Sequence, residues 1–133
     1  MPVEELLAEV NVVVPWPDCG WNWIEAGAAG WIAGLVNALP RESVELFNLA
    51  TAGRRDDAFA LYRWFLPLLR MDTVPKFVQL IKQVQEELGV GSARVRPPRL
   101  QVVGEELAAV RTAVEQAQAH RPPQAAASTV FSA

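Results

Sequence analysis

Few side chains in this sequence could act as nucleophiles or proton carriers. Cys19 and His120 are the single cysteine and the single histidine, and they lie near opposite ends of the chain, so their positions predict no Cys–His pair. We expect Cys19 to be an inert, partly buried thiol, because free cysteine usually behaves as a small hydrophobic residue. One cysteine and one histidine also exclude an internal disulfide framework and most zinc sites.

The two lysines, Lys76 and Lys82, are the residues that could form an imine with a carbonyl substrate. An imine-forming lysine needs a desolvated pocket that keeps its amine neutral. Both lysines lie instead on one predicted helix among polar neighbours, and lysine is rarely buried without a partner. We therefore expect both lysines to be solvated.

Adjacent acids and closely spaced glycines give no catalytic pattern either. The pairs Asp56-Asp57 and Glu86-Glu87 lie on predicted helices, where neighbouring side chains diverge and do not share a proton. The run Gly89-Val90-Gly91-Ser92 follows a predicted helix rather than a strand, and it lacks the lysine of a phosphate-binding loop. The sequence therefore predicts no catalytic residue, no metal ligand and no cofactor-binding residue.

The composition indicates one globular unit with a hydrophobic core. The chain has 133 residues, of which 51% are hydrophobic and 20% charged, and its net charge is −3 with a pI of about 5.2. An acidic balance disfavours nucleic acid as a partner. The most apolar stretch, Ala26 to Leu39, is shorter than the ~20 residues that span a bilayer, and Met1 to Val10 lacks the features of a signal peptide. We expect a cytoplasmic protein that binds neither nucleic acid nor membrane.

The first forty residues predict a small parallel sheet. Val10 to Val14 and Ala29 to Ala33 suit short buried strands. Asp18 to Ala28 is predicted to form a short helix between them, which gives a βα-type arrangement. In the Gly30-x-x-x-Gly34 motif, we expect the glycines to let backbone segments pack closely.

From Pro40 onward the apolar residues recur at helical spacing. Pro67 is expected to kink or end the second of these helices, and Arg94 to Leu100 predicts an extended connector. Within it, we interpret Arg96-Pro97-Pro98-Arg99 as an internal tie between helices rather than a ligand for a proline-reading domain. The predicted helices are Arg41–Ala52, Arg54–Arg70, Pro75–Gly89 and Gly104–Ala119. The side chains expected to form their common core are Phe47, Phe59, Tyr62, Phe65, Leu69, Phe77, Ile81, Val84, Leu107 and Val110.

Four segments, taken in order, resemble one enzyme family. The run G-A-A-G-W-I-A-G-L-V-N-A-L-P-R-E-S-V-E-L-F (Gly27 to Phe47) is similar to the last barrel strand and following helix of the dihydrodipicolinate synthase/N-acetylneuraminate lyase family. The later runs A-L-Y-R-W-F-L-P-L-L, D-T-V-P-K-F-V-Q-L-I-K and R-P-P-R-L fit the carboxy-terminal helices of that family. Within the family, the chain most resembles the branch of pyrroline-hydroxycarboxylate deaminase-like proteins.

The resemblance implies an α/β fold, a (β/α)₈ TIM barrel followed by a small helical domain. Members of the family act through a lysine on the sixth strand, which forms an imine with pyruvate or a related 2-oxo acid. A tyrosine relays protons and paired hydroxyls hold the carboxylate. These elements have no match in this sequence, and the sixth strand would lie upstream of Met1. We therefore expect a carboxy-terminal fragment that holds only the last one or two strands, is mostly helical with a helical bundle, and is inactive alone.

The resemblance carries over one site residue. Aligning Asn37 and the run Pro40-Arg41-Glu42 with the family pattern puts Ile32 on the eighth strand. Ile32 would then line the pyruvate pocket near the barrel mouth, where the active sites of such barrels lie. The alternative is that Ile32 is a core strand residue, and both interpretations stay open. The stretch before Ala26 departs from the family pattern, so Val10 to Val14 are not assigned to the seventh strand.

Two functions are compatible with these observations. The chain is predicted to be part of a Schiff-base lyase that acts on a pyruvate-like 2-oxo acid. Alternatively, it is a helical interaction module that forms a homo-oligomer or binds a complementing barrel half, since exposed strand edges and apolar faces promote association. The predicted organisation is a barrel remnant (1–39), the last barrel helix with the helical domain (40–120), and a disordered tail (121–133). We expect 40–119 to hold most of the stability.

Overall fold

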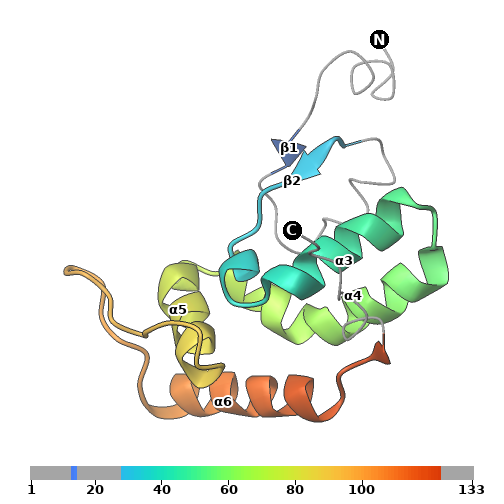
Figure 1. Ribbon diagram of the computed structural model, residues 1–133. Helices are drawn as coiled ribbons and strands as arrows, with labels where there is room; N and C mark the ends of the chain where they lie inside the picture. Colours follow the sequence, from blue (N-terminus) through green and yellow to red (C-terminus); the bar gives the residue numbers. More distant parts are fainter. Residues whose placement is uncertain (1–12, 15–27, 124–133) are drawn as a thin grey trace.

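Two short strands and a set of helices make up the part of the chain that the computed structural model describes, which is residues 13–14 and 28–123 (Figure 1). Strand β1 (Val13–Val14) pairs in parallel with β2 (Gly30–Trp31), in the register Val13↔Gly30 and Val14↔Trp31. The expected parallel pairing is confirmed, although β2 is shorter than the predicted strand. Most of the predicted 18–28 helix, including Cys19, and the tail from 124 onward lie outside the described residues.

Helices form most of the rest, and no barrel occurs within the described residues. The helices are η1 (Leu35–Asn37), α3 (Pro40–Thr51), α4 (Arg55–Leu69), η2 (Arg70–Thr73), α5 (Phe77–Glu87) and α6 (Gly104–Ala119). In Figure 1, α3 and α4 lie side by side below the strands, and α6 runs beneath α4 and α5. The mostly helical character and the four predicted helices are confirmed.

Proline and glycine set several helix ends. Pro40 opens α3 at its first position, where the missing N–H costs no intrahelical bond. Gly53 follows α3 with a φ of +70°, a left-handed conformation that glycine adopts without strain. Pro67 does not end α4, because the helix continues to Leu69. The third long helix begins at Phe77 rather than at Pro75 as predicted, because the preceding residues form a turn.

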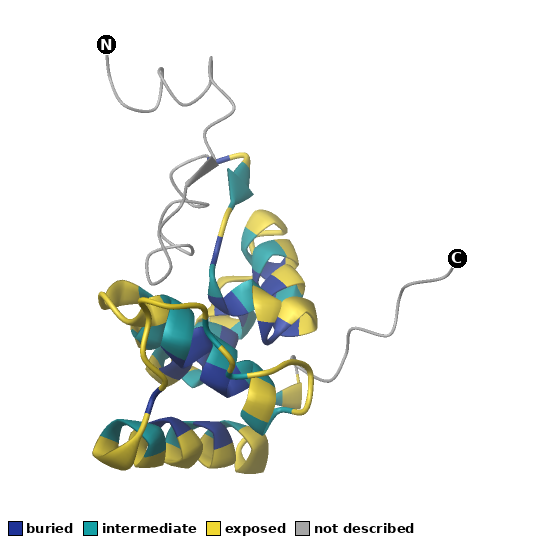
Figure 2. Ribbon diagram, turned by 90° about the vertical axis from the view of Figure 1, so that its left-hand side faces the viewer, coloured by how far each residue is buried: buried dark blue, intermediate teal, exposed yellow. Residues whose placement is uncertain are grey.

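The buried side chains form two neighbouring hydrophobic clusters, which appear as dark blue segments between the helices in Figure 2. The larger cluster joins η1, α4, α5 and α6, and it contains Leu35, Ala38, Leu39, Phe65, Leu68, Leu69, Leu80, Val84, Val102, Val110 and Val114. The smaller one lies between α3 and α4 and contains Leu46, Leu49, Ala58 and Leu61. Trp31, Tyr62 and Trp64 pack against both. The short η1 segment is therefore anchored to the same core as the long helices.

Two of the predicted core residues are on the surface. Phe59 is 50% exposed and Phe77 is 41% exposed, so the prediction is wrong for both. On α4 the buried stripe keeps the predicted Phe65, but it passes through Ala58 and Leu61 where Phe59 and Tyr62 were predicted. One residue turns a helix by about 100°. Phe59 lies instead beneath the Arg63 guanidinium, 5.9 Å from its ring centroid.

Polar contacts fix α6 against the other helices. The Trp64 indole N–H donates a hydrogen bond to the Ala117 carbonyl oxygen at 2.8 Å. An ion pair of 3.0 Å joins Arg111 on α6 to Glu87 on α5. These two contacts hold α6 against α4 and α5.

Among the described residues, no helix has the length and apolar character needed to cross a membrane.

Candidate functional site

The side chains after the start of β2 alternate between two environments. Trp31 packs against both hydrophobic clusters and Ala33 is 7% exposed, whereas Ile32 between them is 64% exposed. Successive side chains of an extended chain point to opposite faces, so Ile32 points away from the helices. Ile32 therefore lies outside the core that the described residues form. Its predicted role in a substrate pocket remains a prediction.

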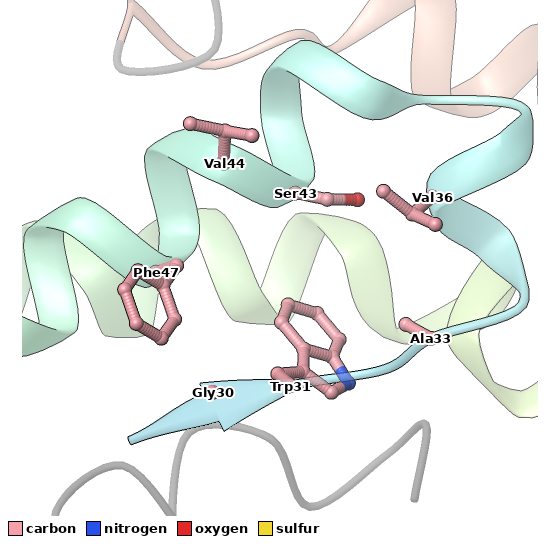
Figure 3. A pocket seen from close by; sticks show the side chains of 7 residues that line it. All are labelled: Gly30, Trp31, Ala33, Val36, Ser43, Val44 and Phe47. Atoms are coloured by element: carbon pink, nitrogen blue, oxygen red, sulfur yellow. The ribbon is translucent and has the colours of Figure 1, made fainter. Parts of the chain in front are cut away.

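Behind β2, on the helical side, lies an apolar cavity of about 250 Å³ (Figure 3). Its lining residues come from β2, the chain just after it, η1 and α3, and they are Gly30, Trp31, Ala33, Val36, Ser43, Val44 and Phe47. Figure 3 shows the Trp31 ring between the strand and α3, with Phe47 and Ser43 opposite. The cavity therefore lies between β2 and α3.

The chemistry of this cavity is limited to packing and one polar contact. The Ser43 hydroxyl donates a hydrogen bond to the Leu39 carbonyl oxygen at 2.8 Å, which ties it to the backbone of its own helix. The Trp31 indole Nε1 is buried and has no hydrogen-bond partner among the described residues. A buried unsatisfied donor is costly. The cavity lining therefore provides apolar contact surface and one unused donor, and no acid–base pair.

The carboxyl end of β2 is held by a close approach at Gly34. The Gly34 N–H donates a hydrogen bond of 2.7 Å to the Asp72 carboxylate on η2. A Cβ atom at Gly34 would lie 2.3 Å from Asp72 Oδ1 and 2.6 Å from Ile81 Cδ1. The expected close packing at this glycine is confirmed. In addition, the Gln85 side-chain amide donates to the Asn37 carbonyl oxygen at 2.9 Å, so both η2 and α5 fix the segment after the strand.

The reactive residues that the sequence singles out and the structure describes are not brought together. His120 caps the end of α6, where its ring Nδ1 lies 3.0 Å from the Gln116 carbonyl oxygen. Lys76 is exposed and pairs with Glu106 at 2.8 Å, in agreement with the prediction of a solvated lysine. Asp57 pairs with Arg54 at 2.6 Å. No group of histidine, cysteine, aspartate and glutamate side chains could hold a metal ion within the part of the chain that the structure describes.

Sequence reasoning missed a buried carboxylate. Glu42 in the first turn of α3 is 3% exposed and forms an ion pair with Arg121, which follows α6. This pair joins the beginning of the helical region to its end. The sequence carries one weak signal for it, since Glu42 is acidic at a helix start, but nothing local marks Arg121 as its partner.

One half-buried acid, Glu87, has a shifted pKa. The hydrogen bond from Arg111 and a second from the Gln83 amide lower the pKa of Glu87 below its ordinary value of 4.5. Both hydrogen bonds favour the charged carboxylate, and partial desolvation opposes them without reversing the direction. This shift belongs to the contact between α5 and α6. It is structural and lies outside the β2 cavity.

The geometry described above agrees with a comparison to known protein families. The model of the dihydrodipicolinate synthetase family matches residues 17–117, a range that includes β2, η1, η2 and nearly all of α3 to α6. No curated protein sequence matches the chain. The matched range holds the cavity, the Gly34–Asp72 contact and Ile32. The chain therefore belongs to the dihydrodipicolinate synthetase family.

Proposed function

We propose that this chain is the carboxy-terminal part of a Schiff-base lyase that acts on pyruvate or a related 2-oxo acid. In this proposal β2 is the eighth strand of the barrel, and Ile32 forms part of the pocket wall. The observation that carries it is the alternation along the strand: Trp31 and Ala33 face the helices, while Ile32 is 64% exposed on the other side. A strand of a closed barrel has this pattern, with one face toward the helices and one toward the barrel interior.

The catalytic lysine of the proposed enzyme comes from outside this chain. Lys76 is exposed and forms an ion pair with Glu106, and it lies in the turn before α5 rather than on a strand. Lys82 lies on α5, and neither lysine lines the cavity behind β2. An imine-forming lysine must be desolvated and aimed at the substrate carbonyl. The isolated chain is therefore expected to be inactive.

Trapping with borohydride tests this part of the proposal. The full chain is incubated with pyruvate and sodium borohydride, and adducts are located by peptide mass spectrometry. We expect no adduct on either lysine under conditions in which a catalytically active family member is fully labelled. A pyruvate-dependent adduct at Lys76 or Lys82 would contradict the proposal.

A chimaera tests the role of Ile32. The segment from β2 to α6 of this chain replaces the corresponding segment of an active family member, so that the barrel supplies the lysine. We expect the chimaera to form the borohydride adduct on that lysine, and Ile32→Ala to raise the KM for pyruvate. Val103→Ala, at another exposed apolar residue, is the control and should leave KM unchanged. Equal KM values for both variants would exclude Ile32 from the pocket.

A second function, an association module, is favoured by the apolar face around the cavity. Val44 is 48% exposed and Phe47 is half-buried, and both line the cavity beside the Trp31 indole, whose N–H has no partner among the described residues. A homo-oligomer or a complementing barrel half would cover this face. We expect light scattering at micromolar concentration to give a mass above that of the monomer, and Val44→Lys to shift it toward the monomer. A monomeric mass for the unaltered chain would count against this function.

A further inference from the structure

A second cavity, of about 550 Å³, lies between α5 and the connector that joins α5 to α6. Val78 and Lys82, one turn apart on α5, contribute to one wall. The connector supplies the other lining residues, which are Arg94, Val95, Arg96, Pro97 and Arg99. Four of the lining residues carry positive charge and none carries negative charge, so the cavity is strongly basic.

This basic character is local, because the chain as a whole is acidic. The sequence has 12 lysines and arginines against 15 acids, and four of the 12 line this cavity. Four basic residues outside the cavity are paired with acids, in Arg54–Asp57, Lys76–Glu106, Arg111–Glu87 and Arg121–Glu42. Within the described residues, none of the four cavity cations forms an ion pair. A concave wall of unpaired cations concentrates positive potential.

The connector is held in place at both ends of the cavity. The Ala93 N–H donates a hydrogen bond of 2.8 Å to the Glu86 carboxylate, which engages the acid nearest to Lys82 along α5. The Arg99 N–H donates to the Arg96 carbonyl oxygen at 3.1 Å, and this turn keeps both arginines at the cavity. Beyond the turn, Val102 is 6% exposed and anchors the chain in the main hydrophobic cluster.

We propose that this cavity binds a small organic diphosphate or triphosphate. Guanidinium groups bind phosphate oxygens through two parallel hydrogen bonds, and three arginines with one lysine match the charge of such a ligand. The apolar residues Val78, Val95 and Pro97 in the same lining offer contact surface to its organic group. The volume lies within the ~300–1,000 Å³ typical of small-molecule sites. The site is separate from the 2-oxo acid pocket proposed at β2, because the two cavities share no lining residue.

Isothermal titration of the full chain with ADP, inorganic pyrophosphate and citrate tests the proposal. We expect ADP to bind with a Kd of about 0.1 mM or lower, pyrophosphate to bind more weakly, and citrate to bind most weakly. The double variant Arg96→Gln/Arg99→Gln should weaken ADP binding at least tenfold. Both arginines are exposed, and circular dichroism verifies that the variant remains folded. The matched control Arg41→Gln/Arg63→Gln removes the same charge outside the cavity and should leave the affinity unchanged.

Several outcomes would overturn this site. Absence of ADP and pyrophosphate binding at about 1 mM would exclude it, because even a weak specific site gives a measurable Kd in that range. Equal weakening by the control variant would reduce the effect to bulk charge. Citrate binding as tightly as pyrophosphate would remove the preference for phosphate. A single-stranded oligonucleotide that binds more tightly than ADP would replace the small ligand with a nucleic acid.

Discussion

The strand β2 and the helical core beneath it differ in how completely their side chains are buried and hydrogen-bonded. Within the described residues β2 forms a ladder over two residues with β1, its Trp31 indole lacks a partner, and Ile32 is 64% exposed. In the helical core, Phe65 and Val84 are fully buried, and the Trp64 indole donates to the Ala117 carbonyl oxygen. Within the described residues, the helical core therefore buries its large side chains and pairs its indole donor, whereas β2 has an unpaired donor and is followed by an exposed apolar side chain.

The contrast follows from the hydrogen bonding of the two kinds of element. A helix makes its backbone hydrogen bonds within itself, so removing neighbouring elements leaves its ladder intact. Parallel strands need partners at both edges and cover on both faces. We therefore expect the helices to hold most of the stability of the described residues, and the pairing of β1 with β2 to be the weaker part. The following predictions test this division.

The largest expected effect is the loss of a core aromatic ring. Phe65 on α4 is fully buried, and its ring centroid lies 5.2 Å from that of Trp64. We expect Phe65→Ala to lower the free energy of unfolding by about 3–5 kcal/mol in urea denaturation. The matched variant Phe77→Ala, at a ring that is 41% exposed, should cost about 1 kcal/mol or less. Equal losses would mean that the helical core is not centred on α4.

Breaking the Glu42–Arg121 pair should give the next largest effect. Arg121→Gln leaves the buried Glu42 carboxylate without its charged partner, and a lost hydrogen bond to a charged group costs about 1.5–3 kcal/mol. Thermal unfolding measures the loss. The double variant Glu42→Gln/Arg121→Gln removes the stranded charge and should recover part of it. A single variant as stable as the unaltered chain would show that α3 is not tied to the end of α6.

The junction between the two regions can be tested at Gly34. In Gly34→Ala the new methyl group would meet the Asp72 carboxylate at 2.3 Å and Ile81 Cδ1 at 2.6 Å, and overpacking of this kind costs about 1–3 kcal/mol. Chemical denaturation measures the loss. Asp72→Ala makes room for the methyl group, so the losses of the double variant should be less than additive. Strict additivity would contradict the close approach.

The smallest expected effect is a pH dependence within the helical region. The pKa of Glu87 is lowered mainly by its hydrogen bond from Arg111. The folded state therefore binds this proton less readily than the unfolded state. The stabilisation is present above the ordinary pKa of 4.5 and disappears as the pH falls through the lowered folded value. Glu87→Gln should flatten that part of the stability profile. A profile identical to that of the unaltered chain would exclude the contribution.

The helices could be predicted from the sequence because their signals are local. Apolar spacing and glycine placed α3 to α6 within a few residues, and Gly34 was correctly expected at a close approach. Phe59 and Phe77 were misassigned because helical spacing gives a stripe but does not say which neighbour it faces. On α4 the observed stripe begins with Ala58 and Leu61. Small residues carry little weight in such patterns.

The candidate site was less accessible to sequence reasoning. The cavity behind β2 brings together residues from the strand and from α3, and the Gly34–Asp72 contact spans 38 positions. Contacts of this kind depend on tertiary packing, which has no local pattern. Ile32 was named through the family resemblance, and its exposure adds a geometric reason that periodicity alone does not supply.

Hydrogen exchange of the full chain, followed by mass spectrometry, tests the division between strand and helices most directly. Peptides covering β2 and the residues up to Gly34 are compared with peptides covering α4 and α5. We predict fast exchange at Trp31 and Ile32 and slow exchange across Phe65 and Ile81, since exchange reports the local free energy of opening. Slow exchange along β2 together with fast exchange across α4 and α5 would contradict the account.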